Sequence, residues 1–382
     1  MHGPEVIFVS HHTNWGTAIA RGHQISDAWR QRRTRVISCD PRGDQRRIGR
    51  ELCQMSAKRF DQPDAIEACR NSSSTRLTVH IKYVCRPALQ LLAGAAHVLD
   101  PLDQLYSIDR QSTRAFRGIL AHSEAHARFL RSKVAPPVFV VPHHALPGCP
   151  QAQMSNGLGR AQGQMSILIV GLDAPSAPLR SGLERWSAMR GGTPVRVLYE
   201  YDLRLAELRA TDAKAGPAQL RVGTDVTGKT WVRSLCEMLH GVRAAVAWDQ
   251  LSGTTWLSNC MRTHRLSDAH DCFAIKPGER LLNPLAEGVP TIGYAGYPAF
   301  RELLGQPVGT AVTPRVQDAG DVRSAEWLLA SDLNELTSRL DVLLRNRSAW
   351  RRARELGLQA TGAFTVSRVL PRYEKLLELA SG

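Results

Sequence analysis

The stretch that decides the fold is EVIFVSHHTNWGTAIARGHQISDAWRQRRTRVISCD, residues 5–40. It opens with an apolar run, residues 5–10, which is typical of a strand buried on both faces. A loop with Gly16 follows, then a segment with the pattern of an amphipathic helix, and residues 34–40 return to a strand pattern. Strand, helix and strand at this spacing predict a βαβ unit, and therefore a parallel sheet.

The same alternation continues along the chain and divides it into two α/β halves. About five strands are expected in the first half, and the second half restarts with strand patterns at 166–173, 195–202 and 243–250. Between the halves the periodicity breaks in a segment rich in Gly, Pro, Gln, Ser and Asn, which indicates an interdomain linker. We expect a first domain over 1–148, a linker over 149–165, a second domain over 166–360 and a terminal helix over 361–382.

Composition restricts the class of protein and of ligand. The net charge is +14, from 49 Lys and Arg against 35 Asp and Glu. Such a charge favours anionic ligands, for example nucleotide diphosphates, lipid headgroups or nucleic acid. It is also compatible with a surface that is simply solvated. No apolar run is long enough to span a membrane, and the first residues do not resemble a secretory signal, so a cytoplasmic location is expected. The eight cysteines include no Cys-x-x-Cys pair, so we expect reduced, buried thiols and neither a zinc site nor a disulfide framework.

A late stretch, FAIKPGERLLNPLAEGVPTIGYAGYPAF at 273–300, combines a basic segment with a helix and a strand. Leucines recur at helical spacing after Pro277, Gly288 is expected to end the helix, and a strand follows at once. Lys276, Gly278 and Arg280 should therefore lie at a helix N-terminus.

A helix N-terminus carries roughly half a positive charge, so two cations there suit a multiply charged anion, most simply a diphosphate. Asn283, one turn further along, could hydrogen-bond a ribose or sugar hydroxyl. From these residues alone, an exposed Lys276 and Arg280 on a surface helix are an equally good interpretation.

Residues 281–304, LLNPLAEGVPTIGYAGYPAFRELL, resemble the donor-binding region of GT-B glycosyltransferases, especially the family-4-like enzymes (glycosyltransferase group 1). Looser similarities cover AHSEAHARFL at 121–130, VFVVPHHA at 138–145 and the tail from 341 to 377. The resemblance implies two Rossmann-like domains facing across a cleft, a nucleotide-sugar donor on the second domain and a last helix that returns to the first. Two acidic residues eight positions apart are usual in this family, whereas Ile275 and Asn283 occupy those positions here.

Candidate catalytic and binding groups follow several predicted strands. His12 could act as a base beside Gly16, where backbone could approach a phosphate closely. Alternatively, one of His11 and His12 could pack against Trp15 while the other is solvated. Asp100 could orient or deprotonate an acceptor hydroxyl, or it could cap a turn. Gly171 follows the first strand of the second domain, where donor phosphates approach in this family.

His80 and Lys82 follow one another closely on a predicted strand, but the sequence pattern gives them different positions. Lys82 is expected at the cleft, whereas His80 alternates with apolar residues and suits a core position.

We therefore predict an enzyme that moves a hexosyl group from a nucleotide-sugar donor to a hydroxyl of a glycan, a lipid-linked acceptor or a small molecule. The resemblance favours retention of configuration at the transferred sugar. The sequence contains no Asp-x-Asp or other metal-ligand spacing, so the reaction should need no metal. The nucleotide-diphosphate sugar is expected as a co-substrate, with no further cofactor. Two alternatives keep the fold: transfer to a DNA or tRNA base, and a non-catalytic protein that binds nucleotide-sugars or polyanions. A membrane-bound acceptor would place the protein at the inner membrane face.

Overall fold

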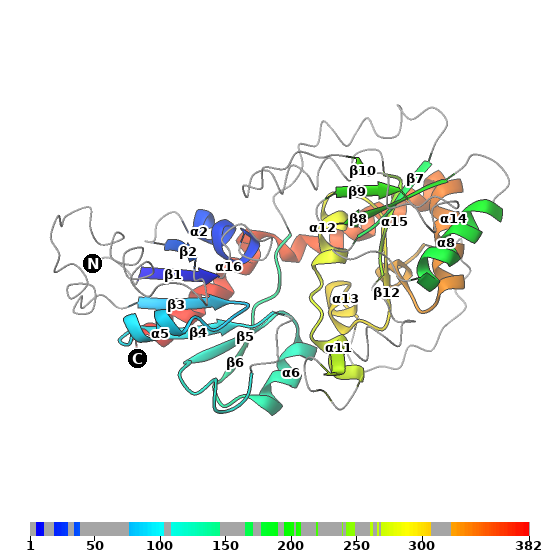
Figure 1. Cartoon of the computed structure of the whole chain (residues 1–382). Helices are drawn as coiled ribbons and strands as arrows, with labels where there is room; N and C mark the ends of the chain where they lie inside the picture. The colour runs from blue at the N-terminus through cyan, green and yellow to red at the C-terminus, as the bar shows by residue number, and fades with distance from the viewer. Residues whose placement is uncertain are drawn as a thin grey trace. The chain divides into compact units, whose positions relative to one another are not determined.

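The computed structural model describes residues 5–10, 19–29, 34–38, 76–102, 108–145, 165–170, 177–189, 195–201, 204–207, 219–220, 239, 242–248, 260–262, 266, 269–306 and 322–381. They form two compact units (Figure 1): unit 1 is Met1–His143 with Val366–Gly382, and unit 2 is His144–Thr365. No helix in the described ranges is long and apolar enough to cross a bilayer.

Unit 1 is built on a parallel sheet. Its strands are β1 (Glu5–Ser10), β2 (Thr34–Ser38), β3 (Arg76–Ile81), β4 (Ala96–Asp100), β5 (Gly118–Ala121) and β6 (Val138–Val140). The strand order is β2-β1-β3-β4-β5-β6 and every pair is parallel. The order reverses between β1 and β3, and open α/β sheets bind ligands beyond the carboxyl ends of the strands at such a switch point.

The C-terminal segment of the chain completes the core of unit 1. Tyr373 lies edge-on to both Phe8 and Trp29, with ring centroids 6.3 and 6.1 Å away. The helical elements of this unit are η1 (Ile19–His23), α2 (Gln24–Ala28), α5 (Arg86–Leu91), α6 (Glu124–Lys133), α16 (Val366–Glu374), η4 (Lys375–Leu377) and α17 (Glu378–Ser381). Burial of Tyr373 therefore holds the end of the chain on a sheet formed by its beginning.

Unit 2 contains a mixed sheet of the order β10-β9-β8-β7-β11-β12-β13. Its strands are β7 (Met165–Ile169), β8 (Val195–Tyr201), β9 (Arg204–Glu207), β10 (Gln219–Leu220), β11 (Ala244–Ala247), β12 (Thr291–Tyr294) and β13 (Leu329–Ala330). The strands from β8 to β13 along the sheet are parallel, whereas β9 and β10 are antiparallel additions at one edge. Here the order reverses between β7 and β11.

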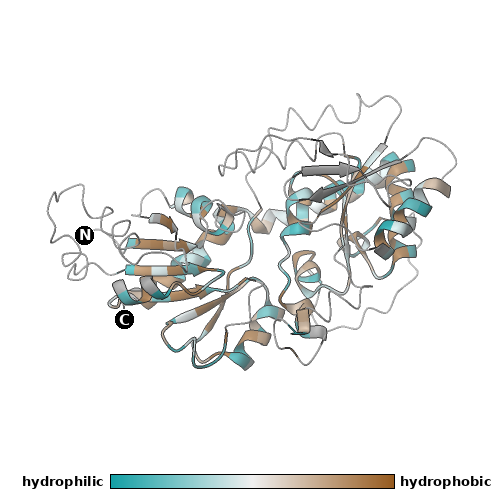
Figure 2. Ribbon diagram, in the orientation of Figure 1, coloured by the Kyte–Doolittle hydropathy of each residue, from teal (hydrophilic) through white to brown (hydrophobic). Residues whose placement is uncertain are grey.

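The helices of unit 2 bury their apolar faces against this sheet. They are α8 (Ala177–Met189), α11 (Ala269–Ala274), α12 (Glu279–Ala286), α13 (Pro298–Leu303), η2 (Ala325–Leu328), α14 (Leu333–Arg345), α15 (Arg347–Thr361) and η3 (Gly362–Phe364). In Figure 2 the helices carry both brown and teal residues, and the strands that are coloured are mostly brown, as expected for amphipathic helices that cover a buried sheet.

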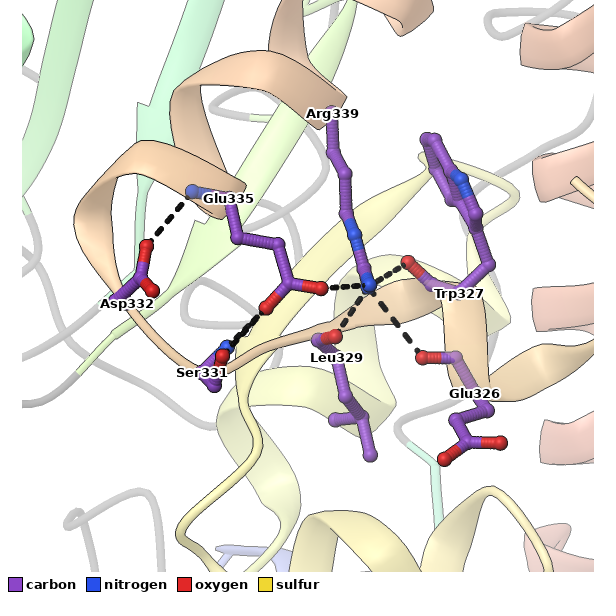
Figure 3. Close-up of polar contacts among 7 residues, drawn as sticks. All are labelled: Glu326, Trp327, Leu329, Ser331, Asp332, Glu335 and Arg339. Atoms are coloured by element: carbon purple, nitrogen blue, oxygen red, sulfur yellow. Dashed lines mark hydrogen bonds and ion pairs between the residues drawn. The ribbon is translucent and has the colours of Figure 1, made fainter. Parts of the chain in front are cut away.

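Helix α14 shows how local and tertiary contacts combine. The Asp332 side chain accepts a hydrogen bond from Glu335 N–H (2.8 Å), and the Glu335 carboxylate accepts from Ser331, so the two acidic side chains cap the start of the helix. On the same helix Arg339, which is 7% exposed, donates to the carbonyls of Trp327 and Leu329 and to Glu335 (Figure 3). A buried guanidinium thus ties η2 and β13 to α14.

The sequence predictions of an α/β fold and of two Rossmann-like domains are confirmed. The antiparallel strands β9 and β10 were not predicted, because their short segments carry no clear periodicity. The expected linker lies almost wholly outside the described residues.

Candidate functional site

The candidate anion site lies in unit 2, at the carboxyl ends of the adjacent parallel strands β11 and β12. Helices α11 and α12 connect these strands. At the far end of the connection, the Pro290 carbonyl accepts a hydrogen bond from Ala245 N–H (2.9 Å), so this end lies at the amino edge of the sheet. Helix α12 therefore starts at the carboxyl edge, next to the switch point at β7 and β11, where ligands bind in open α/β sheets.

Helix α12 is defined by one apolar face and a glycine end. Leu281, Leu282 and Leu285 are at most 1% exposed. Gly288, two residues past the helix, has a φ of +74° and donates its N–H to the Leu285 carbonyl (2.9 Å), as the sequence predicted for the helix end. The positive φ is the reason for glycine here, because a Cβ at this position would otherwise meet only the flexible end of the Arg354 side chain, 2.9 Å away at Nε.

The basic residues flank the start of this helix. Gly278 is the N-cap, and its carbonyl accepts hydrogen bonds from Leu281 N–H (3.1 Å) and Leu282 N–H (2.9 Å). Lys276 lies two residues before the cap, Arg280 is the second helical residue, and both are half-buried. Two cations and the positive end of the helix macrodipole can together balance the charge of a diphosphate.

Aromatic residues brace the strand ends beside this site. Trp248 directly follows β11 and Tyr294 ends β12, and their ring centroids are 5.0 Å apart. Phe273 on α11 lies edge-on to Tyr297 (5.7 Å) and 6.5 Å from Tyr294. These ring contacts connect both strand ends to α11, the helix that leads into Lys276.

Positions 275 and 283, where the family resemblance leads one to expect acids, differ in their surroundings. Ile275 is 1% exposed and packs in the interior, so this position offers no polar group to a ligand. Asn283 is half-buried and lies one turn after Arg280, with an amide able to donate and accept hydrogen bonds. Position 283 therefore presents an amide, and not a carboxylate, on this helix.

The expectation of reduced cysteines is wrong for Cys85, Cys260 and Cys272, the cysteines within the described residues. Cys260 and Cys272 form a disulfide with a Cα–Cα distance of 6.2 Å, and Cys85 is disulfide-bonded as well. Cys272 follows Cys260 at a sequence separation of 12, with no recognisable framework, so only the folded chain shows that they meet. The bond joins α11 to the chain before it.

Asp100, the carboxylate expected to act on an acceptor, is the last residue of β4 and only 1% exposed. Its Oδ2 accepts a hydrogen bond from Arg21 Nε (2.7 Å), and Arg21 also donates to the carbonyls of Val141 and Pro142 (2.9 Å each). Burial raises the pKa of Asp100, while the charge and hydrogen bond of Arg21 oppose that change. In this arrangement Asp100 is the partner of a fully buried guanidinium and links β4 to the end of β6.

His80 is a core histidine, as its alternation with apolar residues suggested. Cys85 N–H donates to His80 Nδ1 (3.1 Å), so the proton of this ring is on Nε2 and points to His97 Nδ1 (3.1 Å). His97 Nε2–H then donates to the Leu92 carbonyl (3.0 Å). Burial, and then the neighbouring His97, lower the pKa of His80 to about 3. Lys82 nearby has a φ of +70° and donates its backbone N–H to the Asp100 carbonyl (2.7 Å).

A second group of histidines was missed by sequence reasoning. His122, His126 and His143 gather at the carboxyl ends of β5 and β6, with ring centroids 4.2 Å (His122–His126) and 6.1 Å (His122–His143) apart. Burial, and then the charges of His122 and Arg21, lower the pKa of His126 well below its ordinary value. Within the described ranges, no group of three or more metal-ligating side chains is arranged to hold an ion. The four-residue spacing of His122 and His126 at a helix start was the available signal.

Three predicted residues, His12, Gly16 and Gly171, lie outside the described residues. The structure brings Lys276, Gly278, Arg280 and Asn283 together around one helix start. It places Asp100 in the interior of unit 1.

No family model matches the sequence, and no curated protein matches it. Solved structures match the fold. A UDP-forming α,α-trehalose-phosphate synthase from Burkholderia vietnamiensis has a TM-score of 0.53 and 12% identity, with 99% of this chain and 100% of that chain covered. The corresponding synthase from Burkholderia xenovorans has a TM-score of 0.52 and 11% identity, over 99% and 100% of the two chains. This chain has the GT-B fold.

A Thermobaculum terrenum O-GlcNAc transferase supports the same fold, with a TM-score of 0.50 and 13% identity over 99% of this chain and 68% of that chain. The chain also spans 57% of a pneumococcal O-GlcNAc transferase, GtfA, with a TM-score of 0.37 and 9% identity. In GT-B terms, unit 1 is the N-terminal Rossmann-like domain, and unit 2 is the C-terminal one with α12 at its carboxyl edge.

Proposed function

We propose that this GT-B chain is a glycosyltransferase that takes a sugar from a nucleotide-diphosphate sugar, with the diphosphate bound at the start of α12. One observation carries the proposal. Lys276 and Arg280 flank the N-cap Gly278 at the carboxyl edge of β11 and β12, beside the switch point of the sheet. UDP is the first nucleotide to test, because the matched synthases are UDP-forming.

The chemistry follows from charge. Cleavage of the bond between sugar and diphosphate leaves negative charge on the departing nucleotide, and preorganised cations with a helix end stabilise that charge as it develops. Lys276 and Arg280 would do this without a metal ion, and Asn283 would hold a ribose or sugar hydroxyl. A hexosyl group and retention of configuration complete the proposal, as the sequence resemblance implies.

The donor site is tested by thermal stabilisation with UDP, GDP and TDP. Wild-type protein should melt at a higher temperature with one of these nucleotides, and the double variant Lys276→Ala/Arg280→Ala should lose the shift. Arg347→Ala/Arg351→Ala is the matched control, because it removes the same charge from exposed positions on α15 in the same unit. If no nucleotide stabilises wild type, or if both double variants respond alike, the proposed site is wrong.

The acceptor is proposed to be a hydroxyl compound, and a net charge of +14 favours an anionic one. Duplex DNA, tRNA and anionic vesicles should be compared at two salt concentrations. Nucleic-acid binding that weakens steeply with salt would support transfer to a base. Binding to vesicles alone would favour a lipid-linked acceptor and a position at the membrane surface.

A non-catalytic role is the second candidate, and the burial of Ile275 favours it. That position holds an acid in related enzymes, and here its side chain is in the core. A nucleotide that stabilises the protein while hydrolysis of the UDP-, GDP- and TDP-sugars stays at background would identify a binding protein. Measurable hydrolysis would identify the enzyme.

A further inference from the structure

The Cys260–Cys272 disulfide lies directly before the proposed donor helix. We propose that this disulfide is a redox site that sets donor affinity: when oxidised it holds α11, and with it Lys276, in place, and its reduction releases them. The inference rests on the proposed function, because it concerns the regulation of the same site.

The disulfide is connected to Lys276 through one short helix. Cys272 is fully buried in α11 (Ala269–Ala274), and Lys276 follows four residues later. The turn between them is held by hydrogen bonds from Ile275 N–H to the Asp271 carbonyl (3.2 Å) and from Lys276 N–H to the Phe273 carbonyl (3.4 Å). A displacement of Cys272 is therefore passed to Lys276 through the backbone.

Helix α11 needs tertiary anchors, because six residues are too few for a helix to be stable alone. Phe273 provides one anchor through its contact with Tyr297 (5.7 Å), and the buried Ile275 provides another. The third anchor is the bond from Cys272 to Cys260, which restricts the chain between them and removes alternative conformations. Of the three, only the disulfide can be broken reversibly by chemistry.

The switching step is thiol–disulfide exchange with a dithiol reductant. A thiolate of the reductant attacks Sγ of Cys260, which is 6% exposed against 0% for Cys272, and Cys272 leaves as a thiolate that takes up a proton. The second thiol of the reductant then attacks the mixed disulfide and releases Cys260 as a thiol. The protein disulfide is reduced to two thiols, and the dithiol is oxidised to its own disulfide.

The test measures the Kd for UDP by titration calorimetry in four samples: oxidised wild type, wild type in excess dithiothreitol, Cys260→Ala/Cys272→Ala, and Cys85→Ala. Reduction and the double alanine variant should each weaken UDP binding about tenfold, the factor expected if α11 holds its bound conformation a tenth of the time. Dithiothreitol should not weaken binding by the double variant any further. Cys85→Ala, which removes the disulfide formed by a cysteine of unit 1, should bind as wild type does.

Hydrogen exchange over 269–286 gives a second readout that does not depend on the nucleotide. Exchange there should be faster in the reduced protein, while β7 and α14 keep their protection and so show that unit 2 is still folded. Equal affinity in oxidised wild type, reduced wild type and the double variant would overturn the redox inference and leave the donor site standing. If oxidised wild type binds no nucleotide, the proposed function and the inference both fall.

Discussion

Acidification should destabilise unit 1 through the His80–His97 pair. Both rings are buried and neutral, and their hydrogen bonds use the Cys85 N–H and the Leu92 carbonyl in a fixed direction. A proton on His80 Nδ1 would remove the acceptor of Cys85 N–H and would place a charge in the core. The folded protein therefore resists protonation of His80 and the unfolded chain accepts it.

The magnitude follows from the pKa of His80, which burial and then His97 lower to about 3 in the fold. In the unfolded chain a histidine has a pKa of about 6.5. The stability is fully present above that value and is lost as the pH falls toward the folded pKa. Between pH 7 and pH 5 the loss from this group is about 2 kcal/mol, and its slope near pH 5 is about 1.3 kcal/mol per pH unit, since unfolding takes up nearly one proton.

The assay compares wild type with His80→Gln, whose amide can still donate toward His97 Nδ1 but cannot titrate. The free energy of unfolding would be followed from pH 7 to pH 5 by hydrogen exchange of the amides in β3 and β4, corrected for the intrinsic exchange rate. The variant should be less stable at pH 7 because Cys85 N–H loses its acceptor, but its stability should fall by about 2 kcal/mol less on acidification. Parallel pH profiles for the two proteins would refute the assignment of His80 as a buried neutral group.

Two further substitutions test the buried charges of each unit. Asp100→Asn should lower the free energy of unfolding in urea by about 3 kcal/mol or more, because it leaves the guanidinium of Arg21 buried without its counter-charge. Replacing both residues with apolar ones should recover much of this loss. A stable Asp100→Asn protein that has lost only sugar transfer would instead favour a catalytic role. Arg339→Met should cost about 3 kcal/mol or more, because the carbonyls of Trp327 and Leu329 lose a buried donor. The control is Arg345→Met at the exposed end of α14, which breaks a 3.8 Å ion pair with Asp341 and should lower the free energy of unfolding by less than about 1 kcal/mol. Equal losses of stability from both changes would contradict the role given to Arg339.

Features encoded within a few residues were predictable from the sequence. The strand runs in both halves, the Gly288 helix end and the Asp332–Glu335 cap all depend on neighbours within one or two turns, and the structure contains them. The position of Lys276, Gly278 and Arg280 at a helix start is of the same kind, since it follows from where the apolar spacing begins.

Contacts between distant residues were not predictable. Arg21 and Asp100 are 79 positions apart, and nothing in either segment shows that they pair. For the same reason the sequence leaves open whether Asp100 acts on an acceptor or caps a turn, whereas the fold buries it against Arg21. The burial of Arg339 was equally unpredictable from the sequence, because a charged residue on an amphipathic helix ordinarily faces solvent.

By itself the sequence determined the βαβ alternation, the division into two α/β halves and the basic helix start, because hydrophobic periodicity and helix signals act over a few residues. Only the tertiary structure decided that this helix start lies beside the switch point of a sheet, that Cys260 bonds to Cys272, and that Asp100 is a core residue. The physical reason is that burial and pairing depend on which strands become neighbours, and strand order is a property of the whole packed sheet.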